Sequence, residues 1–585
     1  MRPSRILPLA AILAAFFTLP CQAMAIGIGP DAVAASPLDI AGEIFTVNSP
    51  GDDNTPDDGF TTLREAIAQA NATPGTDTIV FSGAMAQQTI ISSAPYLITE
   101  SVQIDGYAAP GIKLEITGDS SRELINVSGS ISLSIANISL STRGKGSHSG
   151  VVACGNVEFE RVAFADFHRA LQVCDHTDVS IFASRLENNS YTFVINSAGD
   201  VTRFMDIAID RSIIIDSTTL AFNRLGEIDM HISNSILRGS SSIRVEGTVN
   251  LSIVNSSLLN NPDTFIEAKR IFYREYSNQP YQYFDPTVNM TGVTASGNTE
   301  TIIFSSHADT LIAHSTFYDN LMRDRSNPGY FTSPVLRINH GSVHFDHALI
   351  TGNTSSGPGI SLENTEMTGE FSILPLLDNA SSLIELDGTT GLYLGAEFNL
   401  APLEQSTVYP PFHMPLSDSS LISAGNPSAI AGVDGVPTTE QRDSNRIVGD
   451  GIEIGAVEFN SPPVLDLDAL RDEIDAQFSA LSQAGDPEGD IILDMDNFVS
   501  DPDGHIINDI NLAGDELLAF DTGSHVLSGS RANLLASRDL SVVMEDETGL
   551  TGVAAARLSG SGSSGGPLPL FILLLAGMLL PMRRH

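Results

Sequence analysis

A repeat of short alternating segments constrains this chain more than any other feature of its sequence. From about residue 79 to residue 400, runs with an apolar residue at every second position are separated by Asn, Gly, Ser and Asp. Nine runs align on one apolar anchor residue, with a typical step of 21 to 24 residues: Ile135, Phe159, Ile181, Ile209, Ile232, Ile253, Met290, Ile312 and Phe345. Longer steps before Met290 and before Phe345 mark insertions. Such a period indicates a solenoid whose coils bury their apolar faces against one another.

Two more columns support the alignment. The residue two positions before the anchor is apolar in eight of the nine runs, and the residue five positions after it is apolar in all nine. Because alternate residues of a strand face opposite ways, these positions are expected to point inward. Three positions after the anchor, small residues such as Ser212, Ser235 and Ser256 predict a tight bend between two strands of one coil.

Asparagine recurs eight positions after the anchor. It stands at Asn189, Asn261, Asn298, Asn320 and Asn353. Asparagine tolerates turn conformations and bonds to the nearby backbone, so these side chains are expected to form a hydrogen-bonded ladder along the solenoid. The functional alternative is a row of amides that holds a glycan.

Two cysteines lie one repeat apart. Cys154 and Cys174 are separated by twenty residues, and residues in register on neighbouring coils lie about 4.8 Å apart. That distance suits a disulfide, which for a loop of this size contributes about 3 kcal/mol. A structural bridge is predicted, because the C-x-x-C spacing of a reactive pair is absent.

The repeat resembles that of the right-handed parallel β-helix proteins, the pectate-lyase-like solenoids. The resemblance implies an all-β fold over residues 79–460, including a C-terminal cap, and the handedness comes from the resemblance alone. Leucine-rich repeats share the period, but their consensus spacing and helical side are missing.

The two ends of the chain carry the marks of an exported protein. Arg2, Arg5, an apolar run and Ala23-Met24-Ala25 form a signal-peptide pattern over residues 1–25, with cleavage expected after Ala25. Residues 559–585 read as a Gly/Ser tract, an apolar segment and a basic end. A plain membrane anchor is one interpretation, with the bulk of the chain outside. This tail also resembles the GlyGly-CTERM sorting signal, which implies processing at Gly565 and Gly566 by a rhomboid-type protease.

The segments that flank the repeat resemble known β-helix ends. Residues 26–78 contain Thr62-Leu63-Arg64-Glu65, a capping box, so a helix is expected to begin there and to cover the open end of the stack. This stretch resembles the CSLREA motif, with Thr61-Thr62 in place of Cys-Ser. Residues 441–459 resemble the end of choice-of-anchor β-helix domains, and Arg442, Arg446 and Glu458 are expected to form a capping charge network.

A compositional shift at Pro462-Pro463 indicates a separate module over residues 461–558. Its acidic turns resemble those of cadherin-like or Ig-like β-sandwiches, although residues 465–481 have helical periodicity, which fits a sandwich poorly. The resemblance implies Ca²⁺ bound by Asp501, Asp503 and Asp546, since Ca²⁺ prefers oxygen ligands. The alternative is a pair of solvated acidic turns, with no cofactor.

Charge restricts the partners. Asp and Glu outnumber Lys and Arg by 71 to 29, giving a net charge of −42. Such a surface repels nucleic acid and anionic lipid. Tryptophan is absent, which argues against an aromatic platform for sugar stacking.

The candidate groove follows from the column two positions after the anchor. There His314 and His347 fall in register, with Asp346 beside the second and His344 one strand position earlier. Arg161 and Arg211 occupy the same column in earlier coils and are candidate binding residues. The His/Asp cluster could bind a metal, act in acid–base chemistry or be solvated surface.

Two functions remain open at this stage. The first is a non-catalytic, surface-exposed solenoid that binds an extracellular polysaccharide or another cell-surface ligand. The second is a secreted polysaccharide lyase or glycoside hydrolase. No arrangement of Asp with Arg or Lys reproduces a known lyase pattern, which favours the first.

Overall fold

The computed structural model describes residues 42–560 and 570–572, apart from residues 56–58, 119–120, 130, 144–145, 175, 197–203, 218–219, 240–241, 274–280, 324–332, 356, 381, 387–389, 393–397, 407–408, 449–450, 487–488, 503–504, 514–517, 531–532, 534–539 and 557. Ala25, Gly565 and Gly566 lie outside the described residues. Within the described part of the chain, no helix is long and apolar enough to cross a membrane.

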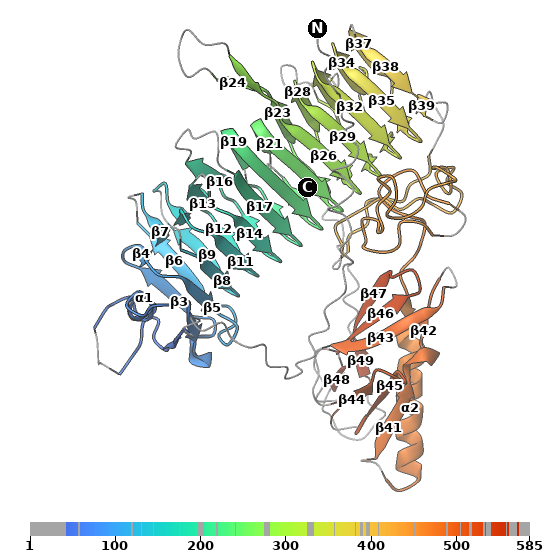
Figure 1. Cartoon of the computed structure of the whole chain (residues 1–585). Helices are drawn as coiled ribbons and strands as arrows, with labels where there is room; N and C mark the ends of the chain where they lie inside the picture. Colours follow the sequence, from blue (N-terminus) through green and yellow to red (C-terminus); the bar gives the residue numbers. More distant parts are fainter. Residues whose placement is uncertain are drawn as a thin grey trace, which may run out of the picture. The chain divides into compact units, whose positions relative to one another are not determined.

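Most of the chain is a parallel β-helix built from three stacks of strands (Figure 1). The first stack holds the anchor residues: β1 (Ile44–Val47), β2 (Asp77–Phe81), β5 (Val102–Asp105), β8 (Leu133–Ala136), β11 (Val157–Glu160), β14 (Val179–Phe182), β17 (Phe204–Asp210), β26 (Thr287–Thr291), β29 (Asp309–Ala313), β32 (Ser342–Asp346), β35 (Glu366–Glu370) and β38 (Leu383–Leu386). Each strand pairs in parallel with its neighbours one coil away, as predicted.

The second stack follows the first along each coil. It is the 13-stranded sheet of β3 (Thr89–Ser92), β6 (Lys113–Thr117), β9 (Ser139–Arg143), β12 (Ala163–Ala165), β15 (Arg185–Glu187), β18 (Ile213–Ile215), β20 (Ile236–Arg238), β22 (Ser257–Leu259), β27 (Thr294–Ser296), β30 (Thr316–Phe317), β33 (Leu349–Ile350), β36 (Ile373–Leu374) and β39 (Gly391–Leu392).

The third stack closes the coil. It comprises β4 (Tyr96–Ile98), β7 (Glu123–Val127), β10 (Ser149–Ala153), β13 (Arg169–Cys174), β16 (Tyr191–Asn196), β23 (Ile266–Lys269), β28 (Ile303–Ser306), β31 (Leu336–Asn339), β34 (Ile360–Glu363) and β37 (Leu377–Ala380). Two long strands, β19 (Leu220–Ser233) and β21 (Ile243–Val254), run through the third stack into the first.

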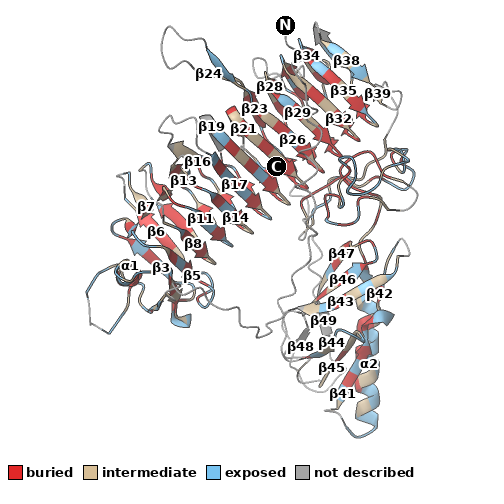
Figure 2. Cartoon of the chain, in the orientation of Figure 1, coloured by how far each residue is buried: buried red, intermediate tan, exposed pale blue. Residues whose placement is uncertain are grey.

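The interior of the coils is apolar and continuous. All nine anchor residues are at most 1% exposed, and they belong to one hydrophobic cluster that runs the length of the solenoid (Figure 2). The bend between the first two stacks carries a serine ladder, in which the Ser184 N–H donates to the Ser212 hydroxyl and the Ser212 N–H to the Ser235 hydroxyl. The predicted inward columns and the predicted bend are therefore confirmed.

Polar ladders and a disulfide join neighbouring coils. The Nδ2 of Asn298 donates to Oδ1 of Asn320 at 2.8 Å, and the Nδ2 of Asn320 donates to Oδ1 of Asn353 at 2.7 Å. These side chains also donate to buried carbonyls, so the asparagine row is a structural ladder. Cys154 and Cys174 form the predicted disulfide, with their Cα atoms 4.7 Å apart.

Helix α1 (Leu63–Ala70) covers the first coils. Thr62 is its N-cap, and the reciprocal bonds between Thr62 and Glu65 complete the predicted capping box. Leu63, Ala66 and Ile67 join the solenoid core. A short 3-10 turn, η3 (Gly83–Met85), follows β2.

Residues 398–460, the flanking segment, lie along the outer face of the second stack. Five outward side chains in register on successive strands contact this segment: Ser257, Thr294, Thr316, Leu349 and Ile373. Gln441, for example, bonds to both Ser257 and Thr294. The segment predicted to cap the end of the solenoid therefore covers a side of it.

The C-terminal module contains two antiparallel sheets and a helix around one core. One sheet is β41 (Asp490–Asp494), β45 (Val526–Ser530) and β44 (Ala519–Asp521); the other is β43 (Ile507–Ala513), β46 (Leu540–Asp546) and β47 (Thr551–Ala556). Helix α2 (Leu467–Gln483) packs Leu470, Ile474 and Phe478 into the same core, which confirms the helical periodicity. The remaining elements are the pair β40 (Val464–Leu465) and β42 (Val499–Ser500), the 3-10 turn η4 (Met495–Asn497), and the pair β48 (Leu558–Gly560) and β49 (Leu570–Ile572).

Candidate functional site

The column two positions after the anchor lies at a left-handed bend and not on a strand face. Its nine members, which we call the bend column, all have φ between 46° and 66°: Asn137, Arg161, Ala183, Arg211, Asn234, Asn255, Gly292, His314 and His347. A left-handed residue turns the chain from the first stack into the second, and asparagine and glycine tolerate it best. The candidate groove assumed that this column faces outward from a strand, which was wrong because the predicted bend already begins here, one position before the serine ladder.

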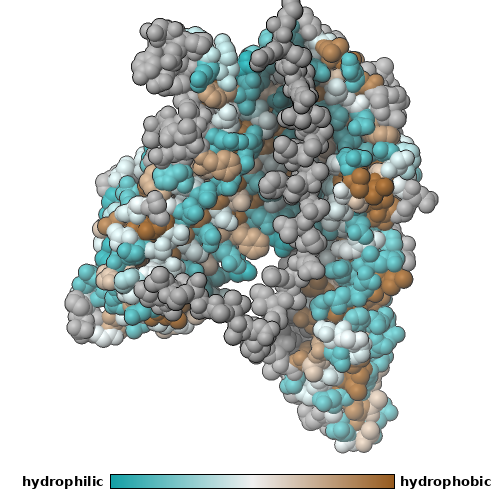
Figure 3. Space-filling view, in the orientation of Figure 1, coloured by the Kyte–Doolittle hydropathy of each residue, from teal (hydrophilic) through white to brown (hydrophobic). Residues whose placement is uncertain are grey.

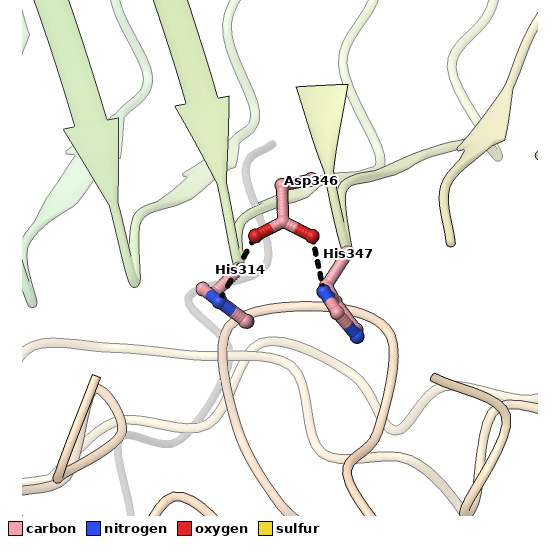
Figure 4. A group of neighbouring side chains, drawn as sticks. All are labelled: His314, Asp346 and His347. Atoms are coloured by element: carbon pink, nitrogen blue, oxygen red, sulfur yellow. Dashed lines mark hydrogen bonds and ion pairs between the residues drawn. The ribbon is translucent and has the colours of Figure 1, made fainter. Parts of the chain in front are cut away.

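His314, Asp346 and His347 do come together at this bend. The imidazole rings of the two histidines stack, with centroids 4.7 Å apart, and the Asp346 carboxylate bridges them (Figure 4). Nε2 of His314 lies 3.5 Å from Oδ2 of Asp346, and Nδ1 of His347 bonds to Oδ1 of Asp346. The predicted cluster is therefore real.

This cluster is buried, which corrects the predicted groove. His314 is 0% exposed and His347 is 2% exposed, because the flanking segment covers both. Arg446 of that segment donates to Nδ1 of His314 at 3.0 Å, and the backbone N–H of Asn426 donates to Nε2 of His347 at 2.9 Å. The histidines hold the flanking segment against the coils.

These outer hydrogen bonds settle the protonation of the histidines. Arginine and a backbone N–H can only donate, so Nδ1 of His314 and Nε2 of His347 must carry lone pairs. The other ring nitrogens carry the protons and face Asp346. Burial, together with Arg446 and His347, holds the pKa of His314 well below its usual value, so this ring stays neutral.

The same bonds disfavour a metal, although the three donor groups are close enough to hold one. A metal-binding histidine coordinates with one nitrogen and usually donates its other N–H to an acceptor. Here the outer nitrogens accept hydrogen bonds, so coordination by the inner ones would require imidazolate rings. The residues present do not fit a resident metal ion, and we assign the cluster a structural role.

The predicted charge network of the flanking segment is confirmed for Arg446 and Glu458, whereas Arg442 contacts Glu458 only at its backbone carbonyl. Arg446 pairs with Glu458, and both are fully buried; Arg442 pairs with Glu440. Burial lowers the pKa of Arg446 to about 10 and raises the pKa of Glu453 to about 7. Glu453 accepts one backbone bond from Ser423 at 3.3 Å through Oε1.

The other predicted residues of the solenoid lie apart from this cluster. Arg161 and Arg211 are more than half exposed and lie beside the acidic residues that precede them, Glu160 and Asp210. His344 is on the outer face of β32, where Nδ1 bonds to the Thr368 hydroxyl at 2.8 Å. The sequence placed His344 in the His/Asp cluster, but its contacts in the structure are with Thr368 and Glu370 and not with the buried histidine pair.

The structure places an open polar row on the outer face of the first stack. Eight residues from successive coils follow one another, three positions before the first-stack anchor: Asp178, Asp206, Asp229, Asn250, Thr287, Asp309, Ser342 and Glu366. None of this polar column is buried. Reading that column of the aligned repeat would have found it, because the sequence alone carries the signal.

Neighbouring members of the polar column are in hydrogen-bond contact. Asn250 donates to Asp229 at 2.7 Å, Thr287 to Asn250 at 3.0 Å and Ser342 to Asp309 at 2.7 Å. Burial, and then the charges of Asp178 and Asp229, raise the pKa of Asp206. The column thus offers carboxylate, amide and hydroxyl groups in a line along the solenoid.

The predicted calcium ligands of the module are partly described. Asp501 and Asp546 have buried side chains whose oxygens lie near a nitrogen of His505, with donor atoms within 4.8 Å of one another. Oδ1 of Asp546 already accepts bonds from Thr548 and Leu550. Asp503 lies outside the described residues. The described groups therefore supply two carboxylates of the six to eight oxygens that Ca²⁺ usually takes.

Comparison with known proteins gives structural likenesses at low identity. No family model and no curated protein matches the chain. Bacteriophage CBA120 tailspike protein 3 matches with a TM-score of 0.28 and 12% identity, over 57% of this chain and 58% of the tailspike. The A-module of Azotobacter vinelandii mannuronan C-5 epimerase AlgE4 matches with a TM-score of 0.21 and 12% identity, over 56% of this chain and 95% of the epimerase module. The catalytic domain of a GH87 α-1,3-glucanase in complex with nigerose matches with a TM-score of 0.22 and 10% identity, over 61% of this chain and 67% of the glucanase domain.

Proposed function

We propose that this chain is an exported β-helix protein of the cell surface that binds an extracellular glycan without catalysis. The observation that carries the proposal is the polar column, an uncovered line of hydrogen-bonding groups repeated at the spacing of adjacent strands, about 4.8 Å. A linear polysaccharide can contact several coils at once along such a line, so weak hydrogen bonds from each coil add up.

Glycan binding by the full-length protein tests this proposal. Neutral and uronate-containing polysaccharides are immobilised, and retention of the wild type is compared with retention of Asp206→Asn/Asp229→Asn. We expect retention of at least one glycan and a loss of at least tenfold in affinity for the variant. Asp472→Asn/Asp475→Asn, which changes two exposed carboxylates of helix α2, is the matched control and retains binding. Equal affinity of wild type and Asp variant would remove the polar column from the site.

A glycoside hydrolase is the second candidate, and one observation favours it. Asp178, Asp206 and Asp229 occupy consecutive coils, so neighbouring and alternate carboxylates fall near the two separations used by retaining and inverting enzymes. The raised pKa of Asp206 suits a general acid. Sustained release of reducing ends, abolished by Asp206→Asn, would replace the binding proposal with this one.

We also propose that the ends of the chain direct it to the envelope. The CSLREA-like and choice-of-anchor-like segments, the signal-peptide pattern and the GlyGly-CTERM-like tail support export followed by processing at Gly565–Gly566 by a rhomboid-type protease. Intact mass of the protein from membrane and medium fractions tests this. A membrane-bound species that retains His585 would instead indicate a plain anchor.

Calcium binding by the module is proposed for the group at Asp501 and Asp546. Titration of the full-length protein with Ca²⁺ is expected to raise the melting temperature of the module, and Asp546→Asn should remove that rise. A larger rise with Zn²⁺ than with Ca²⁺ would point to His505 and against calcium.

A further inference from the structure

An antiparallel hairpin interrupts the solenoid at its longest insertion. Between β23 and β26 the chain forms β24 (Ile271–Tyr273) and β25 (Gln282–Phe284) instead of bending directly into the first stack. Figure 1 shows β24 extending away from the coils. A two-stranded hairpin buries little surface of its own, so its stability depends on contacts at its base.

One face of this hairpin is aromatic. Phe272 and Tyr283 are directly paired across the two strands, and Tyr281 precedes Tyr283 by two positions, so all three rings point the same way. Phe272, Tyr283 and Tyr281 are 67%, 60% and 45% exposed. Within the described residues only seven Phe and Tyr side chains are exposed, and three of the seven lie here.

Contacts at the base hold these rings in place. Nε and Nη2 of Arg270 both donate to the Asp285 carboxylate, and this pair joins the residues on either side of the hairpin. The guanidinium also lies over the ring of Tyr283, 5.2 Å from its centroid. The rings of Phe272 and Tyr281 meet edge to face at 5.4 Å. A ligand would therefore meet an ordered aromatic face and would lose little free energy in fixing it.

Polar side chains continue from the hairpin base along the bend between the third and first stacks. The backbone N–H of Arg270 donates to the carbonyl oxygen of Ser306. The residues that follow Arg270 in this bend on successive coils are His307, His340 and Asn364. The two imidazoles stack at 4.9 Å, and Nδ2 of Asn364 lies 3.3 Å from Nε2 of His340. Hydrogen-bonding groups thus lie next to the aromatic face.

We infer that the aromatic face of Phe272, Tyr281 and Tyr283 is a stacking subsite for neutral sugar rings. Exposed apolar surface of this kind marks binding sites, and the faces of aromatic rings attract the electron-poor C–H groups on one side of a pyranose. Asp285 neutralises Arg270, the cation that the described residues place against the face, and the net charge of −42 disfavours an anionic glycan. The inference rests on the proposed glycan binding and names its ligand class. It also revises the sequence argument against an aromatic platform: tryptophan is absent, but phenylalanine and tyrosine gather here.

A tryptophan reporter tests the inference, because the chain contains no other tryptophan. Phe272→Trp keeps an aromatic ring on the face, and its fluorescence is titrated with neutral hexose oligosaccharides and with oligouronates. Tyr107→Trp places the same reporter on an exposed residue far along the sequence. We expect saturable spectral shifts with at least one neutral oligosaccharide in the first variant and none in the second, and at least tenfold weaker retention of Phe272→Ala/Tyr283→Ala on the matching polysaccharide.

The outcomes separate this inference from the proposed function. If the wild type retains a glycan but the Phe272→Trp signal is silent, or responds only to oligouronates, the aromatic face is not the subsite, while the proposed function stands. If no glycan is retained by the wild type, both fail. A sedimentation coefficient that falls in Phe272→Ala/Tyr283→Ala would mean that the face binds a second copy of the chain, which also overturns the inference.

Discussion

The bend column and the polar column arise from the same coils but differ in their access to solvent. At the bend, His314 and His347 are buried under the flanking segment; on the first stack, Asp206 and Asp229 stay open. On the face of the molecule shown in Figure 3, hydrophobic residues form only scattered patches. The repeat decides which side chains stack in register. A segment 132 residues away from His314 decides which of them a ligand can reach.

The largest effect on stability is expected from the buried charge pair of the flanking segment. Arg446→Met leaves Glu458 without its partner in a fully buried position and removes the donor to His314. Loss of one partner of a buried ion pair costs about 3–5 kcal/mol. Hydrogen exchange of the Asn426 and Gly455 amides, which bond to His347, measures the docking free energy of the segment.

A surface arginine of the bend column provides the control for that change. Arg161→Met removes an exposed pair with Glu160, and exposed pairs contribute about 1 kcal/mol or less. Exchange at Asn426 should be unchanged in this variant. Equal effects of the two substitutions would mean that the flanking segment does not depend on its buried charges.

Docking of the flanking segment should also depend on pH through Glu453. Its pKa is raised in the folded state, to about 7 from 4.5, so the folded protein binds the extra proton and stability falls as pH rises through this range. The shift corresponds to about 3 kcal/mol. Lowering of the His314 pKa acts in the opposite sense, since stability is lost as pH falls below 6.5.

Glu453→Gln separates the two titrations. The variant keeps the pH dependence of stability that comes from His314 and lacks the one that comes from Glu453. Its stability relative to wild type should therefore grow from pH 4.5 to pH 7 and then level off. Denaturation of both proteins at matched pH values gives the difference. A difference that is constant with pH would place the Glu453 carboxylate in contact with water.

A smaller effect is expected from the histidine pair itself. His347→Ala leaves the Asn426 N–H without its acceptor and removes one of the two histidine contacts of the Asp346 carboxylate, which costs about 2 kcal/mol. Glycan retention should not change, because the ring is buried. His344→Ala, at a side chain on the outer face, serves as the comparison. If His347→Ala alone lost glycan retention, the buried cluster would have to take part in binding or catalysis.

The sequence was sufficient to predict the coils, but it did not predict where the flanking segment covers their surface. Period-two alternation around Ile181 and Phe345 predicted the strands, their register, the asparagine ladder and the Cys154–Cys174 bridge, because in a solenoid each of these depends on neighbours one period away. The left-handed bend at His314 has no unique residue code, since Asn, Arg, Ala, Gly and His all occupy it. Where the flanking segment docks depends on contacts between distant residues, which no local pattern records.

The smallest effect is expected on the open column. Asp206→Asn removes a carboxylate whose pKa is raised by partial burial and by Asp178 and Asp229, so the substitution should stabilise the solenoid slightly, by about 0.5 kcal/mol. Because exposed charges are screened by salt, the gain should shrink between low and physiological ionic strength. Urea denaturation at the two ionic strengths measures it, with Asp309→Asn as the control, since Thr287 and Ser342 flank Asp309 in place of like charges. A destabilised Asp206→Asn would mean that this carboxylate contributes more as an acceptor, for its neighbours or for a bound cation, than it costs through repulsion.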